Sequence, residues 1–170
     1  MISTDYPIEA MDFLLDKACL PERFFPLTEK KDLLLSELRR LGCRRKSDAA
    51  SLPDEILAPL FPETLGLFRR FLSLYDPRPQ KLRELKALSL TPEESACFRE
   101  LYLLPGVKEV RARLYFLSGF RTLTDFTQST AEEIIGKTAQ TVSERQLSCT
   151  VPLPKEVRTH IAVAKAFTME

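Results

Sequence analysis

Few residues in this chain are suited to covalent chemistry. His160 is the only histidine, and it lies between Val157 and Ile161 in a segment with helical periodicity. A catalytic histidine needs a nucleophile and an orienting carboxylate beside it, and no spacing in the sequence suggests either. The sequence also contains no P-loop, no G-x-G-x-x-G and no H-E-x-x-H motif. We therefore expect no catalytic residues, no cofactor and no small-molecule substrate, and predict that the protein is not an enzyme.

Metal binding is equally poorly supported. The four cysteines, Cys19, Cys43, Cys97 and Cys149, are far apart and form no C-x-x-C pair, and a single histidine adds little to them. Isolated thiols are typical of small buried side chains in a reducing compartment. We predict no metal site.

Two groups of basic residues could bind anions. The first comprises Lys108, Arg111 and Arg113, with Arg121 nearby in the sequence. The second is a denser cluster at the expected end of a helix, where the helix dipole already favours cations: Arg39, Arg40, Arg44, Arg45 and Lys46. Each group fits a phosphate-contacting patch, and each also fits an ordinary solvated helix face.

The overall charge does not decide between these readings. The 170 residues include 25 Lys and Arg against 24 Asp and Glu, a formal net charge of +1, so no global field attracts nucleic acid or anionic lipid. The N-terminus has no signal-peptide pattern, and no apolar run is long enough for a membrane span. We expect a cytoplasmic protein that does not bind membranes.

Helical periodicity recurs along nearly the whole chain, and sustained strand alternation is absent, so we predict an all-α fold. The two prolines in Asp76–Pro79 are incompatible with a continuous helix and predict a boundary. We expect an N-terminal helical unit at 1–76 and a C-terminal unit at 81–170. Within the second unit, we expect Val107, Val110, Leu114 and Leu117 to form a buried stripe and Gly136 to end a helix.

The two units share a sequence pattern. Aligning Gly42 with Gly119 places Gly-Cys-Arg-Arg-Lys-Ser-Asp (42–48) on Gly-Phe-Arg-Thr-Leu-Thr-Asp (119–125), so that the glycine, one arginine, a hydroxyl residue and the aspartate all match. Apolar stripes precede both segments and acidic helix starts follow them. We predict an internal duplication, although similar helix-capping chemistry in unrelated segments would give the same pattern.

The centre of the second unit resembles a known motif. A Pro-Gly-hydrophobic turn, a helix and a second glycine turn are formed by Pro105-Gly106-Val107, Val110, Ala112, Leu114, Gly119-Phe120-Arg121-Thr122 and Asp125-Phe126. This pattern resembles the helix-hairpin-helix motif, here at 104–135. The form is similar to that in the C-terminal domain of the bacterial RNA polymerase α subunit, in TfoX-type competence regulators and in uncharacterised bacterial proteins with tandem motifs.

The resemblance implies a DNA-binding hairpin. In DNA-binding members, a Gly-hydrophobic-Gly turn presents backbone N–H groups to a phosphate. Gly106 and Val107 match that turn, but Lys108 stands where the second glycine is expected. The corresponding residues of the first unit, Pro26-Leu27-Thr28-Glu29, contain no glycine and add a carboxylate. At most the second hairpin is therefore competent.

These observations lead to two functional hypotheses. The first is a non-enzymatic module that contacts the DNA backbone without sequence preference, through Gly106, Val107, Lys108, Arg111, Arg113 and Arg121. The second is a protein–protein interaction adaptor in which the helix-hairpin-helix units are purely structural. The resemblance and the arginines favour DNA, whereas the altered hairpins and the near-zero net charge favour the adaptor.

Overall fold

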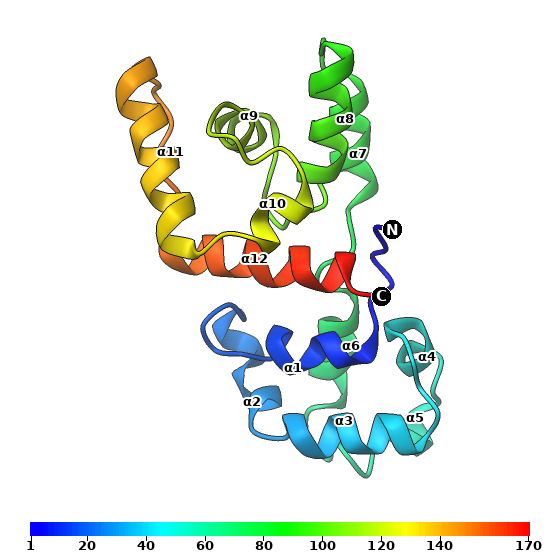
Figure 1. Ribbon diagram of the computed structural model, residues 1–170. Coiled ribbons are helices and arrows are strands. Elements are labelled where there is room, and N and C mark those ends of the chain that lie inside the picture. The colour runs from blue at the N-terminus through cyan, green and yellow to red at the C-terminus, as the bar shows by residue number, and fades with distance from the viewer. The chain divides into compact units, whose positions relative to one another are not determined.

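The computed structural model describes residues 1–170 and is entirely helical, as the periodicity predicts (Figure 1). It contains twelve α-helices, two short 3-10 helices and no strand. No helix combines the length and the apolar character that crossing a membrane requires.

The chain divides into two compact units. Unit 1 comprises residues 1–75 and 166–170, and unit 2 comprises residues 76–165. The division thus falls beside the Asp76–Pro79 segment, and the last five residues, which the sequence pattern placed in the second unit, pack with the first.

Unit 1 is built from short helices. Its elements are η1 (Ile8–Ala10), α1 (Met11–Leu14), η2 (Glu22–Phe24), α2 (Phe25–Thr28), α3 (Lys31–Arg40), α4 (Lys46–Ala50), α5 (Asp54–Leu57) and α6 (Leu65–Ser73). The core is aromatic. The rings of Phe61 and Phe68 stack at 4.5 Å between centroids, and Phe24 meets Phe71 edge-on at 6.3 Å.

Unit 2 has longer helices. They are α7 (Pro79–Lys86), α8 (Pro92–Leu101), α9 (Glu109–Leu117), α10 (Leu123–Thr127), α11 (Ala131–Arg145) and α12 (Pro154–Thr168), the last of which ends in unit 1. Helix α9 packs against both α8 and α11 and lies between them (Figure 1). Its buried Tyr115 meets Phe126 of α10 edge-on at 4.8 Å. This packing fixes the segment that precedes α9, where the sequence pattern placed the functional hairpin.

Local capping signals explain where several helices begin. Thr91 accepts a hydrogen bond from the Glu94 amide, and the Glu94 carboxylate accepts one from the Thr91 amide, which completes a capping box. Thr122 and Asp125 form the same reciprocal pair at the start of α10. These bonds satisfy amides that would otherwise have no partner at a helix N-terminus.

Helices α3 and α9 end in the same way. Gly42 and Gly119 follow them with φ of +82° and +95°, a conformation that glycine adopts without strain. In both turns, the amide of the residue after the glycine donates to the carbonyl five residues before it, at 2.9 Å. These are Schellman-type helix ends.

The helices that follow these turns also begin in the same way. The Asp48 carboxylate accepts from the amides four and three residues before it, at 2.8 and 3.0 Å. The Asp125 carboxylate does so at 2.9 and 3.0 Å. Both segments therefore share a turn geometry as well as a sequence pattern.

Two expectations for unit 2 are wrong. Gly136 does not end a helix, because α11 continues to Arg145 and ends at Gln146, which has a left-handed φ of +51°. Val110 is not buried but 65% exposed. The expected stripe started at Val107, but Lys108, which precedes α9, has an extended backbone, so the helical phase does not run from Val107 to Val110.

Replacement by alanine should have opposite effects at Gly136, which lies within a helix, and at Gly119, which has a positive φ. Gly136→Ala should stabilise the protein by about 0.5–1 kcal/mol, because alanine reduces the entropy of the unfolded chain and its Cβ would meet open space in the helix. Gly119→Ala should destabilise it by about 1–2 kcal/mol, because a side chain is strained at positive φ. Urea unfolding measures both changes, and effects of the same sign would contradict this assignment.

Candidate functional site

The segment between α8 and α9 (residues 102–108), here called the hairpin, is anchored by its apolar residues. Leu104 and Val107 are fully buried, and the Val107 amide donates to the Leu104 carbonyl at 3.2 Å. Gly106, between them, has a φ of +73°. Lys108 is exposed and immediately precedes the first turn of α9.

Two side chains from other helices bind the carbonyl groups of this hairpin. Lys81 of α7 donates from Nζ to the Leu104 carbonyl at 2.7 Å, and His160 of α12 contacts the Pro105 carbonyl through Nε2 at 2.8 Å. Burial, together with the charge of Lys108, lowers the pKa of Lys81 to about 8. The hairpin is thus held from α7 and α12.

His160 has a structural role here. It is 1% exposed, and its Nδ1 lies 2.7 Å from the Tyr115 hydroxyl. Because a carbonyl can only accept, Nε2 carries the proton and donates to Pro105, while Nδ1 accepts from Tyr115. The neutral ring therefore joins α12, α9 and the hairpin, and it has no nucleophile beside it.

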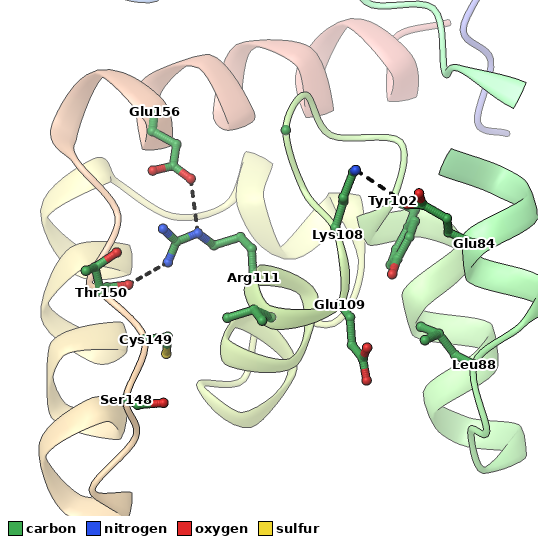
Figure 2. A pocket seen from close by; sticks show the side chains of 12 residues that line it. Glu84, Leu88, Tyr102, Lys108, Glu109, Arg111, Ser148, Cys149, Thr150 and Glu156 are labelled. Atoms are coloured by element: carbon green, nitrogen blue, oxygen red, sulfur yellow. Dashed lines mark hydrogen bonds and ion pairs between the residues drawn. The ribbon is translucent and has the colours of Figure 1, made fainter. Parts of the chain in front are cut away.

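The first two of the predicted phosphate-contacting cations, Lys108 and Arg111, both have glutamate partners (Figure 2). Lys108 Nζ lies 3.5 Å from a Glu84 carboxylate oxygen. Arg111 Nε donates to Glu156 at 3.0 Å, and another guanidinium nitrogen donates to the Thr150 carbonyl at 2.9 Å. The Arg111 side chain is only 17% exposed, so it is a packed component of unit 2.

The remaining two predicted cations are paired as well. Arg113 forms an ion pair with Glu94 and donates a hydrogen bond to its carboxylate. This hydrogen bond is the main reason that the pKa of Glu94 is below its usual range, and the hydrogen bond from the Thr91 amide is the next. Arg121 pairs with Glu93 at 2.8 Å, and its guanidinium lies 4.2 Å from the ring centre of Phe116. The hairpin and its four cations thus come together within unit 2, but each cation has a carboxylate partner.

The basic cluster of unit 1 divides between exposed and packed groups. Arg40 pairs with Glu37 one helical turn away at 2.8 Å, and Arg39 lies 3.9 Å from Glu9. Except for Glu37, these side chains are more than half exposed, and ion pairs at exposed sites are weak.

The other three cations of this cluster differ from one another. Arg45 donates to the Asp5 carbonyl at 2.6 Å. Lys46 is buried, with Nζ 5.3 Å from the ring centre of Tyr6. Arg44 is exposed, and its side chain has no hydrogen-bond or ion-pair partner in the structure. The cluster is therefore not a single open basic patch.

A depression of about 750 Å³ lies beside the hairpin (Figure 2). Its lining includes Tyr102, Val110, Cys149, the ion pairs of Lys108 and Arg111, and Glu109. A second depression of about 360 Å³ lies further along α9 and shares Glu109, Val110, Ser148 and Cys149 with the first. No three His, Cys, Asp or Glu side chains come together in a way that could hold a metal ion.

The sequence patterns did not reveal several of these groups. Lys81, Glu84 and Glu156 lie in no motif or charge cluster of the sequence. Two of the glutamates that pair with the arginines, Glu93 and Glu94, lie in Thr91–Glu94, which has the residue types of a local capping signal. Contacts across 45 residues, such as Arg111 with Glu156, have no local signal.

Comparison of the chain with protein-family models, with curated proteins and with solved structures gave no match. The fold and the site therefore define a class only, an all-helical protein with a rigidly held hairpin.

Proposed function

We propose that this protein is a non-enzymatic protein-binding module in which the hairpin positions helices instead of contacting nucleic acid. One observation carries the proposal: Lys108, Arg111, Arg113 and Arg121 each lie against a glutamate. Proteins that bind the DNA backbone neutralise phosphates with free cations. Here each of these four cations already has a carboxylate where a phosphate would bind.

The charges near the hairpin argue against a phosphate ligand. Glu109 adds a further carboxylate in the first turn of α9, directly beside Lys108. A phosphate approaching this turn would meet that charge and would have to displace Glu84 or Glu156 from its partner. For Arg111 it would also have to compete with the Thr150 carbonyl.

Sequence-independent DNA backbone contact is the second candidate, and one feature favours it. The amides of the first three residues of α9 have no hydrogen-bond partner in the chain, and the turn before them contains Gly106 at positive φ. Free amides at a helix N-terminus are suited to anions.

We also propose that the two units are diverged copies of one unit, each built around a helix-hairpin-helix-like motif. The matched turns at Gly42 and Gly119, which lie 77 residues apart, support this. The same offset pairs six further buried residues of the first unit with buried residues of the second: Leu27 with Leu104, Leu35 with Ala112, Leu38 with Tyr115, Cys43 with Phe120, Ala49 with Phe126 and Leu57 with Ile134. A duplicated helical scaffold whose first copy lacks the hairpin glycine fits a structural role for the motif.

The first test is a fluorescence-anisotropy titration with a short labelled duplex at about 50 and about 200 mM salt, between which phosphate contacts weaken strongly. The parent chain is expected to show no binding at either concentration. Binding at low salt that collapses at high salt would overturn the proposal in favour of the DNA candidate.

Charge reversal at Lys108 would then locate any such binding. Lys108→Glu is preferred to Arg111→Glu, which would place two carboxylates together at a half-buried site. Arg40→Glu is the matched control, since both lysine and arginine are about two-thirds exposed and paired with a glutamate. Weakening by Lys108→Glu alone would assign DNA to the hairpin.

A second experiment tests for protein binding directly. The full chain is immobilised and used to capture proteins from a lysate before and after nuclease treatment. Capture that survives nuclease supports a protein-binding module. Capture that disappears with nuclease, or no capture, contradicts it.

A further inference from the structure

The two depressions on unit 2 adjoin one another at the first turn of α9 and are together called the α9 groove. They share four residues of α9 and of the segment after α11 (Glu109, Val110, Ser148 and Cys149). Figure 2 shows the segment 148–150 on one side of α9, and on the other side Glu84 of α7 and Tyr102, which follows α8. The groove therefore runs across the first turn of α9, with walls from separate parts of unit 2.

The groove contains one exposed apolar side chain with partly buried apolar neighbours. Val110 is 65% exposed and lies where the two depressions meet. Leu88 and Tyr102 line one depression, and Leu114, Leu117 and Leu147 line the other. A single exposed valine on a convex surface needs no explanation. An exposed valine in a hollow, beside the partly exposed Leu88, Leu117 and Leu147, gives a partner's aliphatic side chain an apolar surface to contact.

The charges of the groove specify the partner further. Lys108 and Arg111, which line the first depression, are paired with Glu84 and Glu156. Arg113, in the second depression, is paired with Glu94. Glu109 lines both depressions and has no hydrogen-bond or ion-pair partner for its side chain. The groove therefore presents one unpaired carboxylate beside its exposed valine.

We infer that the α9 groove binds an amphipathic polypeptide segment of a partner protein, which places an aliphatic side chain on Val110 and a lysine or arginine against Glu109. The inference rests on the proposed protein-binding function and names the partner's chemistry. An anionic partner would face Glu109 without a free cation in return. A basic segment gains an ion pair without disturbing the three that are already formed.

The test uses two labelled synthetic helical peptides of equal length and the full chain. One peptide carries leucine and lysine at amphipathic spacing, and the other carries glutamate in place of lysine. Fluorescence polarisation should show binding of the leucine–lysine peptide and not of the leucine–glutamate peptide. Absence of binding by the leucine–lysine peptide, or equal binding of both, overturns the inference.

Charge reversal tests the role of Glu109. Glu109→Lys should abolish binding of the leucine–lysine peptide and create binding of the leucine–glutamate peptide. Glu132→Lys is the matched control, because Glu132 is also an exposed glutamate in the first turn of a helix. Equal effects of the two variants would show that net charge alone governs binding and would overturn the inference.

Truncation tests the role of Val110. Val110→Ser should weaken binding about tenfold, as expected for an aliphatic anchor. Leu33→Ser is the control, since Leu33 is 55% exposed on α3 and precedes Val110 by the same 77 residues that separate the two turn glycines. Both side chains are exposed, so both variants should keep the helical circular dichroism of the parent. Equal affinity of the parent and Val110→Ser would overturn the role of the groove.

The lysate capture and the peptide titration distinguish failure of the groove assignment from failure of the protein-binding function. If nuclease-resistant capture persists while the leucine–lysine peptide does not bind, the groove assignment is wrong and the protein-binding function stands. If both are absent, both proposals are wrong.

Discussion

Replacing His160 with alanine is expected to lower the free energy of unfolding by about 3–5 kcal/mol, the largest effect of any single substitution considered. The ring is almost fully buried, with its centre 5.6 Å from that of Tyr115 and 6.5 Å from that of Phe126. Alanine would leave a cavity. It would also remove the partner of the Tyr115 hydroxyl and of the Pro105 carbonyl.

Urea unfolding followed by circular dichroism measures this loss. Arg158→Ala is the control, because Arg158 is exposed on the same helix and its truncation should change the stability by no more than about 0.5 kcal/mol. If His160→Ala is no more destabilising than this control, the two hydrogen bonds do not anchor the hairpin.

The parts of the fold that could be predicted from sequence depend on neighbouring residues. The caps at Thr91 and Thr122 and the turn at Gly119 are set within a few positions, by hydrogen bonds from a side chain to nearby amides or by the φ that glycine permits. The all-helical class follows from the same local periodicity. The predicted all-helical class and the predicted turn at Gly119 are both confirmed.

The candidate site could not be predicted in the same way because its meaning depends on distant partners. Lys108, Arg111 and Arg113 look like a basic patch in sequence, where nothing shows that glutamates from other helices face them. The exposure of Val110 depends on where α9 begins and on how far its neighbours cover it. Gly136 is tolerated within α11 because packing against α9 stabilises that helix in place of local propensity.

Lowering the pH from 6.5 to 4 is expected to destabilise the protein by on the order of 3 kcal/mol through His160 alone. Burial lowers the pKa of His160 from 6.5 to about 4, the nearby Arg111 and Lys81 act in the same direction, and the Pro105 carbonyl and Glu156 oppose them. The unfolded chain binds a proton near pH 6.5, whereas the folded chain does not until about pH 4. The stability from the neutral ring is therefore complete above pH 6.5 and is lost as the pH falls through this window.

His160→Gln separates this effect from other titrations, because glutamine offers both a donor and an acceptor but cannot take up a proton in this range. Urea unfolding at several pH values should show a steep loss for the parent and a shallow one for the variant. Asp48 and Glu94, whose pKa values are lowered by their hydrogen bonds, contribute stability that is lost mainly at more acidic pH. If the unfolding free energy of His160→Gln falls as steeply with decreasing pH as that of the parent, protonation of His160 is not the cause of the loss of stability. A flattened slope would tie the acid stability of unit 2 to the same ring that holds the hairpin in place.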